Sequence, residues 1–262
     1  MKNRINSLFE TKKKNILSVF YTAGFPTLHS TVLIAEALSN AGADIIEIGI
    51  PYSDPVADGP TIQESNKIAL ENGINLALII DQVKVIRQRV SIPIILMGYV
   101  NPVMQYGIEE FARDVSTAGV DGVILPDLPM DAYLEEYKEI FAAVNLHNAF
   151  LISPTTSAAR ISKIDAVTDG FIYAVAASSI TGAKGSFANE QLEYFKRLQS
   201  MKLKNPYLIG FGISNHDTFT TACKYGAGAI VGSAFINMLR NSSDVVNDVS
   251  DFVIGIRKGE GV

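Results

Sequence analysis

Short apolar runs alternate with amphipathic segments along the whole chain. Each run is nearly continuous in hydrophobic residues, which is typical of parallel strands covered by helices. The segments between them, such as TLHSTVLIAEALSNAG, place apolar residues at i, i+3 and i+4, the spacing of a helix with one buried face. The pattern predicts strands over residues 16–22, 44–50, 93–100, 122–127, 149–153, 170–176, 206–212 and 229–234.

The number of these units predicts the fold. About eight strand–helix units in roughly 250 residues is typical of a (β/α)8 barrel. A doubly wound sheet is the alternative, and it is disfavoured because no G-x-G-x-x-G motif follows the first strand. Since no Ser/Pro-rich linker or low-complexity tract interrupts the pattern, we expect one α/β domain over residues 1–262, a TIM barrel. Extra helices are expected at the N-terminus, after the second strand and at the C-terminus.

Composition narrows the classes of partner. With 262 residues and 48% hydrophobic content, the chain is large enough for one sizeable core. Its net charge of −5 argues against nucleic acid as a partner, because nucleic-acid-binding proteins usually carry a basic face. The single cysteine, Cys223, allows no internal disulfide and fits a reducing compartment. With no signal peptide and no apolar run of transmembrane length, a cytoplasmic protein that binds no membrane is expected.

Two carboxylates stand where the active site of such a barrel lies, at the carboxyl ends of the strands. Glu47 sits inside the apolar run of residues 44–50, and burying an ionised carboxylate without a partner is costly. It is either a core carboxylate paired with a neighbour such as Tyr173, or a general acid/base whose pKa is raised by an apolar pocket. Asp58 follows in a proline-bounded loop, where it is either a turn residue or a ligand contact. We favour the functional interpretation for both.

Glycines at three later strand ends indicate a phosphate site. Gly182, Gly212 and the pair Gly232-Ser233 offer backbone N–H groups that no β-carbon shields from an anion. The loops after the last two strands, with the start of a short helix, are the usual phosphate cradle of this fold. Any one of these glycines alone is more simply a turn residue, but the three clusters together favour phosphate.

The sequence lacks the residues that a Schiff-base mechanism or a metal site would need. No lysine stands at a strand end, which argues against a Schiff-base aldolase. The three histidines, His29, His147 and His216, form no pattern with carboxylates that suggests a metal site. Acid–base work therefore falls to the carboxylates or the tyrosines.

The stretch from Glu47 to Pro60, EIGIPYSDPVADGP, closely resembles the signature of the tryptophan synthase α subunit family. The resemblance covers essentially the whole chain. It includes FYTAGFPT at residues 20–27, the Asn-Pro after Tyr99, the Leu-Pro after Asp127, and the Gly-Phe-Gly-Ile-Ser that starts at Gly210.

This resemblance implies a (β/α)8 lyase that cleaves indole-3-glycerol phosphate to indole and glyceraldehyde 3-phosphate by a retro-aldol step in tryptophan biosynthesis. It implies no metal or organic cofactor. The implied partner is a β subunit that uses pyridoxal phosphate to join indole to serine, in an αββα heterotetramer.

The resemblance also implies roles for individual residues. Glu47 would be the general acid/base, and Asp58 would bind the indole N–H and stabilise positive charge on the ring. Tyr173 would orient Glu47, while Phe20 and Tyr99 would line the indole pocket. The remaining implied contacts are phosphate binding by Gly182, Gly212, Gly232 and Ser233, closure over the site by Thr181, and a partner contact by Asp54.

One departure from the family pattern leaves an alternative open. Ser179 stands where the family usually has glycine, and serine tolerates positive φ less well. The alternative is a catalytically weak subunit that acts mainly as an allosteric activator and indole donor for the β subunit. Another phosphate-binding barrel, such as a sugar-phosphate isomerase or indole-glycerol-phosphate synthase, is a further alternative, although the synthase chemistry would call for a strand-end lysine.

Overall fold

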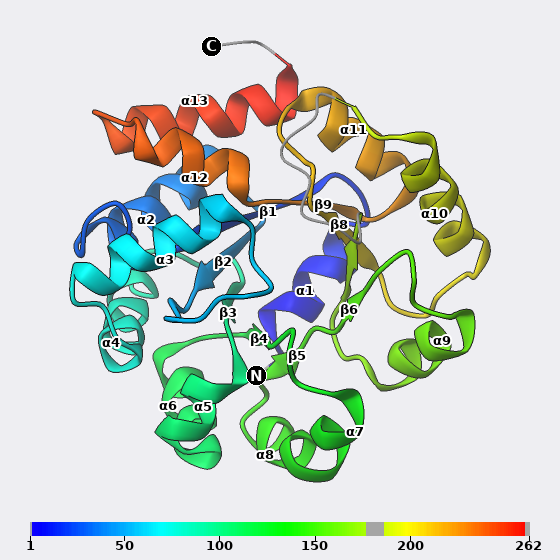
Figure 1. Cartoon of the computed structure of the whole chain (residues 1–262), viewed down its shortest axis with the longest axis horizontal. Coiled ribbons are helices and arrows are strands. Elements are labelled where there is room, and N and C mark those ends of the chain that lie inside the picture. The colour runs from blue at the N-terminus through cyan, green and yellow to red at the C-terminus, as the bar shows by residue number, and fades with distance from the viewer. Residues whose placement is uncertain (1, 177–185, 260–262) are drawn as a thin grey trace.

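Parallel strands follow one another around a ring in the computed structural model, which describes residues 2–176 and 186–259 (Figure 1). Each strand but one, the fifth, is followed by at least one helix on the outside of the ring. The strands are β1 (Ile16–Thr22), β2 (Ile45–Gly49), β3 (Ile94–Met97), β4 (Gly122–Ile124), β5 (His147–Asn148), β6 (Leu151–Ile152), β7 (Ile172–Val175), β8 (Tyr207–Gly210) and β9 (Gly228–Val231).

The sheet closes on itself through residues 147–152. Its order is β5-β4-β3-β2-β1-β9-β8-β7-β6, so β5 and β6 are the two edges, yet only Ala149 and Phe150 separate them along the chain. The Ala149 N–H donates to the Val123 carbonyl at 3.0 Å, and the Tyr173 N–H donates to the Phe150 carbonyl at 2.9 Å. Residues 147–152 therefore act as one barrel strand, and the predicted (β/α)8 fold is confirmed.

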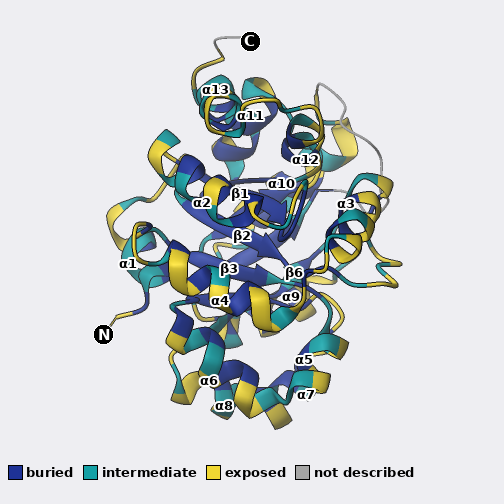
Figure 2. Cartoon of the chain, turned by 90° about the vertical axis from the view of Figure 1, so that its left-hand side faces the viewer, coloured by how far each residue is buried: buried dark blue, intermediate teal, exposed yellow. Residues whose placement is uncertain are grey.

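The helices cover the outer face of the sheet (Figure 2). Their apolar sides face the buried strands and their exposed sides point outward. Gly42 ends the second helix and Gly119 the sixth, each with a φ near +97° (96° and 98°), a conformation that glycine adopts without a steric penalty. The helices are α1 (Arg4–Thr11), α2 (Ser30–Ala41), α3 (Pro60–Glu71), α4 (Leu76–Ile86), α5 (Val100–Tyr106), α6 (Ile108–Ala118), α7 (Met130–Ala132) with the π-helical turn η1 (Tyr133–Tyr137) and α8 (Lys138–Ala143), α9 (Ala158–Val167), α10 (Asn189–Ser200), α11 (His216–Tyr225), α12 (Ser233–Arg240) and α13 (Val245–Lys258).

The predicted extra helices are present as α1, as the pair α3 and α4 after β2, and as α13 after α12. One further helix, α5, was not predicted: the apolar run 93–100 continues beyond the end of β3 at Met97, and its last residue, Val100, already starts α5. Within the described ranges, no helix combines the length and the hydrophobicity that a membrane crossing needs.

Helix α1 closes the amino-terminal mouth of the barrel. It lies across the ring in Figure 1, and its buried residues Ile5 and Phe9 join a cluster with inward-facing strand residues. The Phe9 ring lies 5.8 Å from the ring of Phe171, measured between centroids. With this end of the barrel filled by α1, the opposite end, formed by the carboxyl ends of the strands, is the one left for a ligand.

Candidate active site

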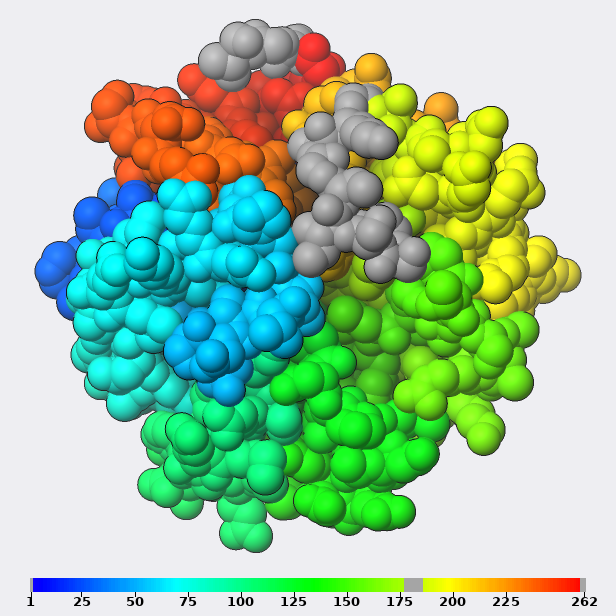
Figure 3. All heavy atoms as spheres, in the orientation of Figure 1, coloured from blue at the N-terminus to red at the C-terminus, as the bar shows by residue number. Residues whose placement is uncertain are grey.

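A cavity of about 210 Å³ opens at the carboxyl ends of the strands. A smaller cavity of about 100 Å³ adjoins it, since the two share Phe20, Asp58, Ile62, Met97 and Phe211 in their walls. The loop after β2 and the start of α3, light blue in Figure 3, reach the centre of this face of the molecule. The two cavities are therefore parts of one site, with Asp58 at their junction.

Glu47 lies in the interior of the barrel, where the alternation of strand β2 directs it. Ile45, two residues earlier on the same face, packs in the inner cluster, and Gly49, two residues later, lines the smaller cavity. Glu47 itself is fully buried and lines neither cavity. It lies opposite Phe20, a residue that lines both cavities, in the pairing of β1 with β2.

The environment of Glu47 suits proton transfer. Its Oε1 accepts a hydrogen bond of 2.6 Å from the Ser18 hydroxyl, and its Oε2 has no hydrogen-bond partner among the described residues. Burial raises the pKa of Glu47 to about 7, against the Ser18 hydrogen bond, which lowers it. A carboxyl group with a pKa near neutrality both accepts and donates a proton at physiological pH. No ion pair fixes Glu47 within residues 2–176 and 186–259, so it is not a structural salt-bridge residue there.

Ser18 is a site residue that the sequence interpretation missed. It is the polar member of the inward row Ile16, Ser18 and Phe20 on β1, and β1 pairs with β2 so that Phe20 lies opposite Glu47. A serine inside the apolar run ILSVFYT, beside a strand that carries a buried glutamate, is the signal that identifies it.

Tyr173, on β7, lines the larger cavity and is 4% exposed. Burial raises the pKa of Tyr173 well above its ordinary value, and the nearby charges of Glu47 and Asp58 raise it further. Among the described residues, Ser18 and not Tyr173 hydrogen-bonds Glu47. The role of Tyr173 in orienting Glu47 therefore stays a prediction.

Asp58 is held by Tyr99, the residue that precedes α5. The Tyr99 hydroxyl donates to Asp58 Oδ2 at 3.2 Å and accepts from the Ala57 N–H at 3.1 Å. Burial raises the pKa of the half-buried Asp58 carboxyl, and the Tyr99 hydrogen bond lowers it. Tyr99 thus connects the loop after β2 to the end of β3, and it keeps the carboxylate at the cavity wall.

The apolar walls of the site suit a flat ring. Phe20 borders both cavities, and Tyr99 borders the smaller one. The Phe20 ring covers Gly49, on which a β-carbon would lie only 2.6 Å from the ring. Ile62, Met97 and Phe211 also line both cavities and were not predicted to do so.

The larger cavity also reaches the predicted phosphate cradle. Gly212, Gly232 and Ser233 all line it, together with Ile213 and Ala234. Helix α12 begins at Ser233, and no side chain of the described residues caps its N-terminus, so the N–H groups of its first turn are available to an anion. Gly212 has a φ of 78°, which favours glycine there.

The remaining predicted positions are Thr181, Gly182 and Asp54. Thr181 and Gly182, with Ser179, fall outside the described residues. Asp54 lies on the exposed part of the loop after β2, where its Oδ2 accepts a hydrogen bond from the Ser53 hydroxyl. It does not line either cavity, which is consistent with a position on an outer surface.

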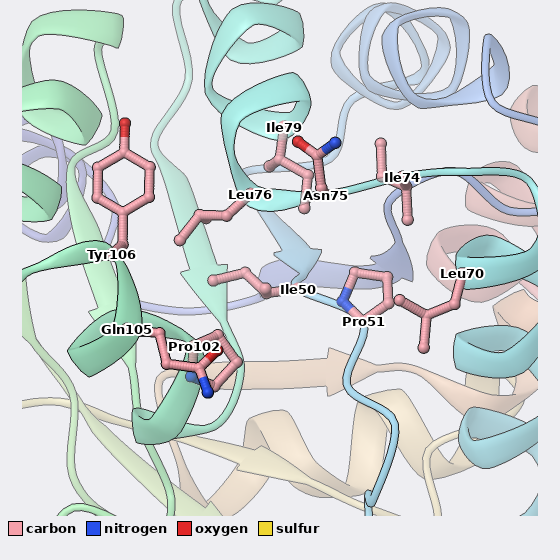
Figure 4. Close-up of a pocket in the computed structure, with 10 residues that line it drawn as sticks. All are labelled: Ile50, Pro51, Leu70, Ile74, Asn75, Leu76, Ile79, Pro102, Gln105 and Tyr106. Atoms are coloured by element: carbon pink, nitrogen blue, oxygen red, sulfur yellow. The ribbon is translucent and has the colours of Figure 1, made fainter.

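A separate pocket of about 340 Å³ lies on the outer side of the loop after β2 (Figure 4). It is lined mainly by apolar side chains of this loop, α4 and α5, including Ile50, Leu76 and Pro102. Its one titratable lining residue, Tyr106, has its hydroxyl bonded to Asp114. The pocket therefore lacks the groups that acid–base chemistry needs.

Comparison with known proteins agrees with this geometry. The family model described as "Tryptophan synthase alpha chain" matches residues 7–257. The tryptophan synthase alpha chain of Flavobacterium psychrophilum is 53% identical over 251 residues, which cover 96% of this chain and 98% of that one. The solved alpha chain of Legionella pneumophila is 31% identical with a TM-score of 0.87, over 98% of this chain and 97% of that one. For a structure of Mycobacterium tuberculosis tryptophan synthase, the values are 28% identity and a TM-score of 0.88 over 100% of both chains. The chain belongs to the tryptophan synthase alpha chain family.

Proposed function

We propose that this chain cleaves indole-3-glycerol phosphate to indole and glyceraldehyde 3-phosphate, as the α subunit of tryptophan synthase in tryptophan biosynthesis. One observation carries the proposal. A single cavity has the Asp58 carboxylate and the glycine-flanked start of α12 in its walls, and the buried Glu47 lies opposite Phe20, which also lines that cavity. An indole ring, a glycerol hydroxyl and a phosphate each find a matching group in that arrangement.

The proposed reaction breaks the bond between indole C3 and the adjacent glycerol carbon. Protonation of C3 makes the ring an electron sink. Ionised Glu47 removes the proton from the hydroxyl on that glycerol carbon, the carbon–carbon bond breaks, and its electron pair returns to the ring. The hydroxyl carbon becomes the aldehyde. A group with a pKa of about 7 is suited both to take the hydroxyl proton and to help protonate C3.

Asp58 would stabilise the positive charge that C3 protonation places on the ring. A carboxylate at the indole N–H interacts more strongly with the protonated ring than with the neutral one, so it favours the transition state over the bound substrate. Tyr99 supports this role, because its hydroxyl holds Asp58 Oδ2 at 3.2 Å.

The remaining contacts follow from the walls of the site. Phe20 and Tyr99 would pack against the indole ring, and Gly212, Gly232 and Ser233 would bind the phosphate through backbone N–H groups. Tyr173 would orient Glu47 once the substrate is bound. Thr181 and Gly182 would complete the site over the ligand.

The proposed partner is a tryptophan synthase β subunit in an αββα assembly, which would use pyridoxal phosphate to join indole to serine. The face around Asp54 is the proposed contact. Val56, two residues after Asp54 in the same loop, is 85% exposed, so an apolar side chain is accessible close to that carboxylate. Met104 on α5 is 58% exposed as well. The loop that carries Asp54 and Val56 also carries Asp58, which would couple partner binding to the site. The proposed compartment is the cytoplasm, in which the single thiol of Cys223 stays reduced.

Indole release by the purified chain tests the proposal, alone and with a β subunit added. The wild-type chain should release indole, and Glu47→Gln should lower the rate at least about a hundredfold while a substrate analogue still binds. Asp58→Asn should lower kcat strongly as well. Glu36→Gln, at a carboxylate that pairs with Arg89 on the outer surface, is the matched control and should leave the rate unchanged. No indole in either condition would favour the alternative of a subunit that only activates its partner.

A further inference from the structure

Ser18 is a buried hydroxyl in an otherwise apolar row. On the inner face of β1 it lies between Ile16 and Phe20, and its exposed fraction is 0%. A buried hydroxyl without a hydrogen bond is destabilising, so a serine in this row needs a partner. The Ser18 Oγ finds it in Glu47 Oε1 at 2.6 Å.

This hydrogen bond is the one that Glu47 makes among the described residues. The other titratable groups that face the site are Tyr173 on β7, Asp58 in the loop after β2 and Tyr99 after β3, and none of them hydrogen-bonds Glu47 within the described ranges. Ser18 lies two residues before Phe20 on β1, farther from the cavities that Phe20 borders, and its hydroxyl is bonded to Glu47. Any effect of Ser18 on the reaction must therefore pass through Glu47.

We propose that Ser18 is a positioning residue, which holds the Glu47 carboxylate in the barrel interior and stabilises its ionised form. An O–H donor bonded to a carboxylate favours the charged state, and a short bond of this kind is among the stronger ones in proteins. Burial opposes that charge, and the Ser18 hydrogen bond offsets part of the opposition. The inference rests on the proposed function of Glu47 as the acid/base. It adds the residue that keeps Glu47 ionised, the form in which Glu47 can accept a proton.

Three substitutions at Ser18 separate the hydroxyl from the space it fills. Ser18→Ala removes the donor, and Ser18→Cys replaces it by a weak donor of similar shape. Ser18→Thr keeps the hydroxyl, and its branched side chain suits a strand. Ser30→Ala is the matched control, because Ser30 is also buried and its hydroxyl bonds Thr27, on the outside of the barrel.

The first measurement is the pH dependence of kcat/KM for indole release. Ser18→Ala and Ser18→Cys should move the acid limb upward by about one pH unit, since each loses a hydrogen bond to an ionised group. Ser18→Thr and Ser30→Ala should keep the wild-type limb. A loss of rate that is equal at every pH, with the limb unmoved, would mean that Ser18 has only a structural role and would overturn the inference.

The second measurement needs no substrate. The Glu47 carboxyl carbon is followed by NMR in protein labelled with ¹³C-glutamate, and its signal is assigned by its absence in Glu47→Gln. The midpoint should rise in Ser18→Ala and Ser18→Cys and stay in place in Ser18→Thr. If Ser18→Ala does not fold, Ser18→Cys carries the comparison, and an unmoved midpoint there overturns the inference. A wild-type chain that releases no indole would count against the proposed function, whereas this titration would still decide whether Ser18 stabilises the ionised carboxylate.

Discussion

Tyr173 occupies the space that a β-carbon on Gly210 would need. The two residues lie on the neighbouring strands β7 and β8, and a β-carbon built on Gly210 would lie 2.4 Å from the Tyr173 hydroxyl and 2.5 Å from its ring carbon Cε1. Tyr173 is 4% exposed, and its ring centroid is 6.3 Å from that of Phe211, so it has little room to move aside. Gly210 is therefore needed for the position of the tyrosine that faces both carboxylates.

We expect Gly210→Ala to lower the free energy of unfolding by about 1–3 kcal/mol, because it overpacks a buried site, and to lower kcat/KM by displacing Tyr173. Adding Tyr173→Leu should cost less in the Gly210→Ala background than in the wild type, because the ring that clashes is then gone. Urea unfolding of the two single variants and the double variant measures this coupling. Gly232→Ala is the control for stability, since among the described residues its β-carbon would meet nothing closer than 3.6 Å. If the two changes in the free energy of unfolding simply add in the double variant, residues 173 and 210 do not interact as proposed.

The buried carboxyl of Glu47 should make stability depend on pH. Folding raises its pKa from the ordinary value of 4.5 to about 7, so the folded state holds the proton more tightly than the unfolded state. The stability from this group is fully present below pH 4.5 and is lost as the pH rises through about 7. Relative to Glu47→Gln, the wild type should therefore lose roughly 3 kcal/mol between pH 4.5 and pH 8.5.

Denaturant unfolding of wild type and Glu47→Gln at several pH values in this range checks the prediction. Taking the difference between the two proteins cancels the titration of all other groups. A Glu47→Gln difference that does not vary with pH would show that folding leaves the pKa of this carboxyl unchanged.

The hydroxyl of Tyr99 should contribute to kcat/KM through its hydrogen bond to Asp58. Tyr99→Phe keeps the contact of about 5.0 Å between its ring centroid and that of Tyr52, but it removes the bonds to Asp58 and to the Ala57 N–H. The pKa of Asp58 should rise further, because the hydrogen bond that lowers it is gone. We expect kcat/KM to fall about tenfold, the effect of one hydrogen bond to a charged group. Steady-state kinetics measures it, and an unchanged kcat/KM would mean that the loop after β2 holds Asp58 without help.

The phosphate cradle can be tested without weakening the fold. Gly232→Ala adds a methyl group at the cavity wall next to the first turn of α12, and its nearest contact among the described residues is Phe20, at 3.6 Å. We expect the affinity for inorganic phosphate and for glycerol 3-phosphate to fall about tenfold, with the melting temperature nearly unchanged. Calorimetric titration gives both affinities. Equal phosphate binding by wild type and Gly232→Ala would place the anion elsewhere.

Substitutions at the amino-terminal end of the barrel should lower the stability of the fold and leave the reaction rate unchanged. Asp121, 3% exposed, accepts hydrogen bonds of 2.9 Å from Arg4, Arg87 and the Ile94 N–H. Asp121→Asn leaves Arg87 without its buried charge partner, so we expect a loss of about 3 kcal/mol in the free energy of unfolding. The kcat of the folded variant should match that of the wild type, because this end of a barrel serves stability. A selective loss of kcat in fully folded Asp121→Asn would argue against that division.

The sequence alone determined the class of fold and the main chemical groups. Continuous apolar runs separated by amphipathic helices indicate parallel strands because both faces of such strands are covered, and Glu47 stands out because an ionisable group in such a run is costly. The alternation of side chains along β2 also places Glu47 on the inner face. These are local signals, so they can be read from one chain segment at a time.

Tertiary structure alone decided which groups meet. The Ser18 bond to Glu47 depends on the register of β1 against β2, the Tyr99 bond to Asp58 on how two loops approach each other, and the fit of Tyr173 over Gly210 on the pairing of β7 with β8. Closure of the barrel through residues 147–152 likewise joins strands that are far apart in sequence. Such contacts arise from the packing of the whole sheet, because no local pattern fixes the distance between side chains on different strands.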